Sequence, residues 1–276
     1  MTEQEFLNIK QESDRYKYSS MKYLDFDSVE SYEVVAQTDD VILLYGYNGE
    51  SKMNEYHWAS NTAEALISSI ETGRDNVLLT FIPEDWVVEL EKMGFQIFAK
   101  WNDYFMEDIS CITDGVKSRF LDKADCQRAS AVTLSCKGQS RGFTGQTAAW
   151  MSIWLKGNED SKIDEGKKNN AIIVHKNNEG EIVGVVCVAT YAHQSDKGPI
   201  VWIREVAVIP EYQRQGIARS LILQALSYGK RHGATRAFLA ADECNKHAIH
   251  LYESIGFVGD RDEVQIDMCL LKMESN

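Results

Sequence analysis

"IPEYQRQGIARSLILQALSYGKR", residues 209–231, is the stretch where an apolar run ends and a helical pattern begins. Apolar residues recur at the spacing of one helix face over residues 217–226. The N–H groups of a first helical turn lack intrahelical partners, and the helix dipole adds partial positive charge there. Gly216 lets the backbone approach an anion closely, and Arg214 and Arg219 add charge at the rim. We therefore expect this turn to hold a phosphate group.

A solvated helix start with two surface arginines is the plain alternative for this stretch. The turn is not a Walker loop, because no Gly-Lys-Ser/Thr follows the glycine. It also lacks the full Gly-x-Gly-x-x-Gly fingerprint of dinucleotide-binding proteins.

The composition is that of an ordinary globular protein with about two domains. The chain has 276 residues, of which 44% are hydrophobic and 26% are charged. Its formal net charge of −13 disfavours nucleic acid and anionic membranes as partners. The polar N-terminal residues are unlike a signal peptide, and the longest apolar run, residues 182–192, is too short to span a bilayer.

The cysteines fit neither a disulfide framework nor a zinc site. There are six, none of them in C-x-x-C spacing and none accompanied by a histidine cluster: Cys111, Cys126, Cys136, Cys187, Cys244 and Cys269. We expect reduced thiols in a cytoplasmic protein that binds no metal.

The second half of the chain shows sharp secondary-structure signals. Runs rich in β-branched residues alternate with turn clusters and with helical periodicity, and glycines stand where helices should end. The expected elements are a helix over 145–157, strands over 171–176, 182–191 and 200–208, a helix from Gly216 to Gly233, a strand over 236–241, a helix from Asn245 to Gly256, and a strand over 264–271.

The first half is less clear. It predicts a strand within 39–49, a helix over 61–71 capped by Asn61 or Thr62, a strand over 77–82, a helix over 84–95, and a strand over 103–109. Turn residues and charges mix over residues 114–127, so we expect two domains, residues 1–119 and residues 120–276.

The two halves contain similar segments. "VVELEKMGFQIF" and "AIHLYESIGFVG" both predict a helix that ends in Gly-Phe before a strand. The same offset of 162 residues relates Gly94 to Gly256 and Met106 to Met268. An internal repeat explains this similarity, although a helix that ends in Gly-Phe is also common by chance.

Two motifs of the second half resemble the GNAT superfamily of N-acyltransferases. Residues 206–218, "VAVIPEYQRQGIA", are similar to its acyl-CoA signature, a strand and a short loop before Gln/Arg-x-x-Gly-x-Gly/Ala. The segment 245–257, "NKHAIHLYESIGF", resembles its second common pattern. The resemblance covers roughly residues 120–276 and implies an α/β fold with a mixed sheet.

The resemblance implies that acetyl-CoA is the co-substrate and that its pyrophosphate lies at Gly216. It implies that strands 200–208 and 236–241 splay apart around the pantetheine arm, which would bond to the backbone of Val206 and Val208 like an added strand. The residues implied to contact acetyl-CoA are Val206, Ala207, Val208, Gln213, Arg214, Gln215, Gly216, Ile217, Ala218, Arg219 and Asn245.

The resemblance also implies catalytic residues. Tyr252 matches the tyrosine that lies near the thioester sulfur and can protonate the leaving thiolate as a general acid. By strand parity, Trp202 and Arg204 share the face of the pantetheine contacts but cannot serve as a base, whereas Glu205 lies on the other face. Glu205 is our candidate base, and a water chain or an acceptor that arrives deprotonated remains an alternative.

In the family, the first two helices and their loop usually form the acceptor pocket. Here they correspond to residues 140–154, with Arg141, Phe143, Trp150 and Trp154 as the residues implied to contact the acceptor. The alternative is that the two tryptophans, four residues apart, are a buried helix face.

The first half resembles GNAT proteins only near its end. The segment 53–70 has no glycine where the anion-binding loop should be, and Leu90 stands in the place of Tyr252. If this half has the same fold, we expect it to be a degenerate GNAT-like domain that binds no acyl-CoA.

We therefore expect an N-acetyltransferase that acts on a primary amine by direct attack in a ternary complex, with a small molecule favoured as the acceptor. A protein N-terminus or lysine is an alternative acceptor. An acyl-CoA-binding sensor or scaffold without turnover is the alternative outside the enzymes. A monomer and a homodimer both remain open.

Overall fold

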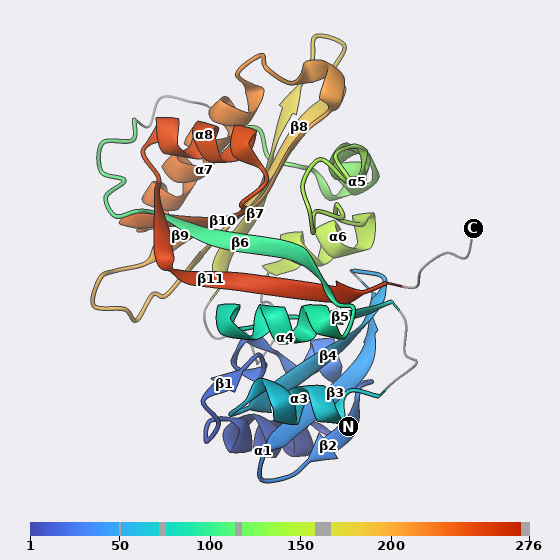
Figure 1. Cartoon of the computed structure of the whole chain (residues 1–276). Coiled ribbons are helices and arrows are strands. Elements are labelled where there is room, and N and C mark those ends of the chain that lie inside the picture. The colour runs from blue at the N-terminus through green and yellow to red at the C-terminus, as the bar shows by residue number, and fades with distance from the viewer. Residues whose placement is uncertain (50, 72–75, 114–117, 158–166, 272–276) are drawn as a thin grey trace, which may run out of the picture. The chain divides into compact units, whose positions relative to one another are not determined.

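The computed structural model describes residues 1–49, 51–71, 76–113, 118–157 and 167–271 (Figure 1). The chain forms two compact units, Met1–Trp101 with Val264–Asn276 and Asn102–Glu263. These units differ from the expected division near residue 120, because β6 (Gln96–Met106) and β11 (Val258–Leu270) each run from one unit into the other. Residues 114–117 of the expected boundary segment lie outside the described residues.

The first unit contains a sheet in the order β2-β3-β4-β5-β11. β3 pairs antiparallel with β2 and β4, whereas β5 pairs parallel with β4. Its elements are α1 (Glu3–Ser13), β1 (Tyr18–Ser19), α2 (Phe26–Val29), β2 (Glu33–Gln37), β3 (Val41–Asn48), β4 (Met53–Ser60), α3 (Ala63–Ser69), β5 (Val77–Leu79) and α4 (Val87–Lys92), with 3-10 turns over Met21–Tyr23 and Glu84–Trp86.

The second unit repeats this topology. β8 pairs antiparallel with β7 and β9, β10 pairs parallel with β9, and β6 is the next strand after β10. Its elements are α5 (Cys126–Ser135), α6 (Ala148–Lys156), β7 (Lys168–Lys176), β8 (Ile182–Tyr191), β9 (Ile200–Val208), α7 (Ile217–Arg231), β10 (Arg236–Asp242) and α8 (Lys246–Ile255), with 3-10 turns over Lys123–Asp125 and Pro210–Tyr212. The shared topology supports the predicted internal repeat.

Two apolar layers bury the sheet of the second unit. Helices α7 and α8 cover one face, and α5 and α6 cover the other (Figure 1). Strand β8 is buried on both faces, which explains why its sequence is a continuous apolar run rather than an alternating one. Gly184 of β8 permits this packing, because a Cβ there would lie 2.9 Å from the side chain of Ile217 on α7.

The elements expected in the second half are present, and the first half departs most from expectation. α1, β2 and β4 were not predicted, and the last strand of that half covers 96–106 rather than 103–109. The sequence of β4 lacks the hydrophobic pattern of a strand, because β4 buries polar residues that are hydrogen-bonded to one another. His57 Nε2 lies 2.8 Å from Glu55 Oε1, which also accepts a 2.6 Å hydrogen bond from Tyr32.

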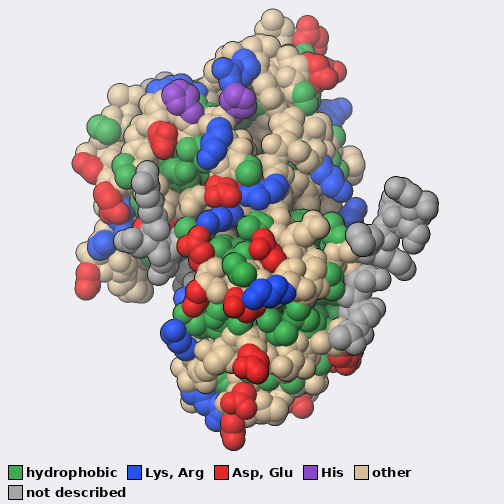
Figure 2. Space-filling view, in the orientation of Figure 1, with side chains coloured by type: hydrophobic (Ala, Val, Ile, Leu, Met, Phe, Trp, Pro, Cys, Tyr) green, Lys and Arg blue, Asp and Glu red, His purple; other side chains and the backbone are tan. Residues whose placement is uncertain are grey.

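The cysteines are free thiols, and the surface carries charges of both signs (Figure 2). All six cysteines are free thiols, and four of them are buried. Acidic and basic side chains are interspersed on the face that Figure 2 shows. Within the described ranges, every helix is too short or too polar to cross a membrane.

Candidate functional site

The central feature of the second unit is a divergence between two neighbouring strands. The parallel pairing of β9 with β10 covers three residue pairs and ends at Trp202 and Phe238. β9 then continues to Val208 and β10 to Asp242 without further pairing between them. This register confirms the predicted splay of strands 200–208 and 236–241.

Backbone groups of β9 face this gap. The N–H of Ile209 donates to the carbonyl of Val183 on β8 at 3.0 Å. Because backbone groups of a strand alternate between its two edges, Ala207 also faces β8, whereas Val206 and Val208 face the gap. The Val208 carbonyl points away from β8, as this alternation requires, because it accepts hydrogen bonds from Gln213 Nε2 at 2.9 Å and from Cys136 Sγ at 3.2 Å.

The start of α7 is open to an anion. Gly216 and Arg214 both have left-handed backbone conformations, with φ of 79° and 62°, and no side chain caps the helix. The first helical hydrogen bond runs from the Ser220 N–H to the Gly216 carbonyl, so the amides of residues 217–219 precede the intrahelical pattern. A Cβ on Gly216 would have no atom within 4 Å. This donor set and the open space beside it fit a diphosphate.

Side chains around this turn hold the loop in place. Gln213 Nε2 donates to Gln139 Oε1 at 2.9 Å, and Gln215 Nε2 donates to the Glu211 carbonyl at 3.3 Å. Arg219 donates to Ser254 Oγ on α8 at 2.9 Å. Ile217 is buried, and Ala218 packs beside it.

The remaining predicted contacts lie near α8. Arg214 is exposed, and its NH1 lies 3.5 Å from His247 Nδ1. Asn245 caps α8, because its Oδ1 accepts a 3.2 Å hydrogen bond from the Ala248 N–H. Its amide oxygen is therefore already used in the protein.

The equivalent turn of the first unit is closed. Thr62 caps α3, and its Oγ1 accepts a hydrogen bond from the Ala65 N–H at 3.3 Å. α3 has seven residues, against fifteen in α7. Leu90, which stands in the place of Tyr252, is fully buried in the apolar core of that unit. Both features agree with a first unit that lacks an anion site.

A β-bulge in β9 overturns the expected strand parity. Cys187 on β8 pairs with Glu205, and the next residue, Val188, pairs with Ile203, so Arg204 is an extra residue. Ile203 packs in the core beneath α7, whereas Arg204 lies over the tryptophans of the α5–α6 face. The expectation that Glu205 shares a face with Ile203 was therefore wrong, because the bulge places Arg204 and Glu205 on the same face.

Glu205 lies in a polar setting at the bulge. Gln146 Nε2 donates to Glu205 Oε1 at 2.8 Å, and Arg204 NH1 lies 3.6 Å from the same oxygen. The side chain of Glu205 is 11% exposed, so it is sheltered but reachable. Sequence reasoning missed Gln146, because no pattern distinguishes a glutamine in the loop before α6.

Tyr252 lies on α8, half-buried and within range of the Glu205 charge. Its ring packs near those of Tyr104 and Phe257, with centroids 6.4 and 6.3 Å away. Burial, the charge of Glu205 and the neighbouring Tyr104 together raise the pKa of Tyr252 to about 12. The phenol is therefore protonated at neutral pH and can donate its proton.

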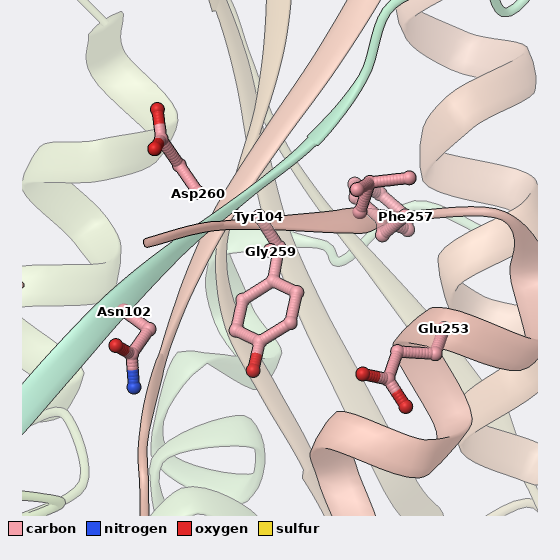
Figure 3. Close-up of a pocket in the computed structure, with 7 residues that line it drawn as sticks. Asn102, Tyr104, Glu253, Phe257, Gly259 and Asp260 are labelled. Atoms are coloured by element: carbon pink, nitrogen blue, oxygen red, sulfur yellow. The ribbon is translucent and has the colours of Figure 1, made fainter. Parts of the chain in front are cut away.

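A cavity of about 480 Å³ lies against the end of α8 and the start of β11, not in the gap between β9 and β10. Figure 3 shows the Tyr104 ring between the side chains of Asn102 and Glu253. Tyr104 contacts both this cavity and Tyr252. The lining of the cavity also includes Phe257, Val258, Gly259 and Asp260.

The residues expected to contact the acceptor have mixed surroundings. Arg141 forms a two-pronged ion pair, at 2.8 and 3.2 Å, with Asp242, whose side chain is fully buried at the end of β10. Hydrogen bonding to Asp242 raises the pKa of Arg141. Phe143 is half-buried beside the core beneath α5 and α6. Arg141 thus anchors the α5–α6 loop to the end of β10.

The tryptophans divide between core and surface. Trp154 is 8% exposed and donates from Nε1 to the Ala171 carbonyl at 3.1 Å, so it belongs to the core. Trp150 stacks on it at 5.1 Å and is half-buried. The guanidinium of Arg204 lies 4.6 Å from the Trp150 ring and also close to Trp202. Arg204 therefore occupies the aromatic surface on the α5–α6 side of the sheet.

Residues 143–257 match the family model described as the acetyltransferase (GNAT) family. A mycothiol acetyltransferase of Thermobispora bispora is 35% identical over 79 residues, which are 28% of this chain and 27% of that protein. The [ribosomal protein bS18]-alanine N-acetyltransferase of Escherichia coli strain K12 is 40% identical over 52 residues, 19% of this chain and 35% of that protein. The chain thus matches only about a third of these relatives' lengths.

Solved structures share the fold over most of the chain. A tandem GNAT protein from the clavulanic acid biosynthesis pathway superposes with a TM-score of 0.54 at 12% identity, covering 84% of this chain and 80% of that one. A GCN5-related N-acetyltransferase from Sphaerobacter thermophilus gives a TM-score of 0.54 at 13% identity, covering 94% and 88%. At such identities the likeness shows the fold alone.

We expect Gly216→Val to lower the affinity for acetyl-CoA by tenfold or more, on the order of the loss of one charge-assisted hydrogen bond, while the protein stays folded. A β-branched residue is strained at this φ and would move the amides that follow it. Gly180→Val is the matched control, since Gly180 has a φ of 84° and equally open surroundings in the β7–β8 turn. Calorimetric titration of both variants measures the difference, and an affinity of Gly216→Val equal to that of the control would contradict the assignment.

The closed turn of the first unit predicts the stoichiometry. We expect one acetyl-CoA per chain, because Thr62 already occupies the N–H group that an anion would need in α3. Calorimetric titration gives this number directly. Two equivalent sites would show that the first unit also binds acyl-CoA.

Proposed function

We propose that the protein is an N-acetyltransferase that moves an acetyl group from acetyl-CoA to a primary amine, because residues 143–257 match the model of the GNAT acetyltransferase family. The new bond joins the acetyl carbon to the amine nitrogen, and the carbon–sulfur bond of the thioester breaks. Direct transfer in a ternary complex needs mainly alignment of the two substrates, which proximity provides.

The observation that carries this proposal is the gap between β9 and β10, which ends at the uncapped start of α7. Val206 and Val208 would hold the pantetheine arm through their backbone groups, and the amides of residues 217–219 would hold the pyrophosphate. Acetyl-CoA would supply the activated acetyl group. The second unit provides this arrangement alone, because Thr62 closes the equivalent turn of the first.

Two side chains of the second unit would handle the protons. Glu205 would take the proton that the amine nitrogen loses, since its carboxylate is sheltered on the α5–α6 face. Tyr252 would donate its phenolic proton to the departing sulfur, because the phenol is protonated at neutral pH.

The relatives favour two classes of acceptor. We put a small-molecule amine first, because the mycothiol acetyltransferase of Thermobispora bispora carries a small molecule in its name. The bS18-alanine N-acetyltransferase of Escherichia coli supports a protein N-terminus as the second candidate. Arg204 already covers Trp150 and Trp202, so those rings are not free to hold a cationic acceptor.

The direct test is a panel of small primary amines and of peptides with free N-terminal alanine, each mixed with acetyl-CoA. Release of the coenzyme A thiol, read with a thiol reagent, measures turnover, and mass spectrometry identifies the acetylated product. Turnover with small amines supports the first candidate, and turnover with peptides alone supports the second. Tight binding of acetyl-CoA without turnover on any acceptor would favour a sensor.

We expect Tyr252→Phe to lower turnover on the order of 10²-fold and to change acetyl-CoA affinity less than threefold. The ring remains, so packing against Tyr104 and Phe257 survives and only the O–H group is lost. Tyr228→Phe is the matched control, because Tyr228 is a buried tyrosine on α7 whose pKa burial also raises. Turnover at saturating acetyl-CoA is compared with a direct binding measurement.

Unchanged turnover in Tyr252→Phe would show that the Tyr252 hydroxyl is not the acid and that the residue serves packing. Equal losses of turnover and of acetyl-CoA binding would make Tyr252 a wall of the binding site rather than an acid.

A further inference from the structure

We propose that Gln146 is the positioning residue for Glu205, so that the loop before α6 orients the carboxylate that accepts the proton of the amine. This inference rests on the proposed function of Glu205. Gln146 Nε2 donates to Glu205 Oε1 at 2.8 Å, across a sequence separation of 59 residues. The bond fixes one carboxylate oxygen of Glu205.

The backbone of Gln146 is held unusually firmly for a loop residue. Its N–H donates to Thr133 Oγ1 at 2.9 Å, and its carbonyl accepts from Ser130 Oγ at 2.8 Å and from Thr133 Oγ1 at 3.2 Å. Gln146 itself is 8% exposed. The two hydroxyl groups of α5 therefore fix the position from which the amide reaches Glu205.

Gly145 permits this close approach. Its φ is 76°, and a Cβ there would lie 2.9 Å from backbone atoms of Leu134 and Thr133 on α5. Only glycine lets the loop press against the helix at this point. The pair Gly145–Gln146 thus forms a rigid support between α5 and the bulge of β9.

An amide suits this place because it donates a hydrogen bond but cannot take the proton. The charged and titratable groups that face Glu205 come from several elements. Arg204 of β9 lies 3.6 Å away. Burial and, after it, the charge of Glu205 raise the pKa values of Cys187 on β8 and Tyr252 on α8. Gln146 is a neutral donor, so it can orient the carboxylate without adding a charge.

The test replaces Gln146 with glutamate, which has the same shape. Two adjacent carboxylates resist double ionisation, so we expect Glu205 to titrate at higher pH in Gln146→Glu than in the native protein. Carbon-13 NMR of the side-chain carboxyl groups measures this titration in the protein alone, with the Glu205 resonance identified by its loss in Glu205→Gln. Gln146→Met, which removes the donor without adding charge, should shift the titration in the same direction.

The pH dependence of kcat/KM gives the second measurement. The apparent pKa of the acidic limb should be higher in Gln146→Glu than in the native protein. At pH values below that pKa, each pH unit of increase in the pKa lowers kcat/KM about tenfold. At high pH the rate should recover to within about threefold of native, a 0.65 kcal/mol difference in the barrier. Gln4→Glu is the control, because it adds the same charge at an exposed position on α1 of the first unit. It should leave the pH profile unchanged.

The outcomes separate this inference from the proposed function. An identical Glu205 titration in the native protein, Gln146→Glu and Gln146→Met would overturn the role of Gln146, whatever the activity. A uniform loss of rate at every pH would also contradict it, because that pattern marks a structural defect. If Glu205→Gln retains the native rate while the titration shifts as expected, the coupling stands and Glu205 is not the base.

Discussion

The arrangement of the site depends on one irregularity, the bulge that inserts Arg204 into β9. Without it, regular alternation after Ile203 would turn the Glu205 carboxylate toward the core beneath α7, where a charged group is costly. With it, Arg204 and Glu205 both turn toward α5 and α6, whereas Val206 keeps its backbone toward the gap. In the proposed function, the same strand would offer backbone groups to acetyl-CoA and a carboxylate to the acceptor amine. A bulge next to a functional site is a common means of re-aiming a side chain.

The two units share one topology but differ at the residue that precedes the helix after β4 and after β9. In α7 the residue before the helix is Gly216, whose left-handed backbone leaves the first amides exposed without a side-chain cap. In α3 it is Thr62, whose hydroxyl accepts one of those hydrogen bonds itself. A cap of this kind stabilises a helix by about 1 kcal/mol, and it removes the donor that an anion would use. The proposed anion site of the second unit thus depends on a helix end that no side chain caps.

The sequence predicts the site where the chemistry is local and fails where it is not. The turn at Gly216, the cap at Asn245 and the position of Tyr252 follow from short-range patterns, and the structure has α7 and α8 where these patterns place them. The bulge is a property of the register between β8 and β9, which no pattern in β9 alone encodes. Gln146 reaches Glu205 only through tertiary contacts, and β4 hides its strand character by burying Glu55 with His57.

The claim on which all of this depends is that acetyl-CoA lies between β9 and β10. Amide hydrogen exchange, resolved by residue, measures it most directly in the protein with and without acetyl-CoA. We expect new protection at the Val206 amide and at the amides of residues 217–219, with no change at the Ala65 amide of α3. Unchanged exchange at Val206 and in the first turn of α7, under conditions where acetyl-CoA is bound, would contradict the claim.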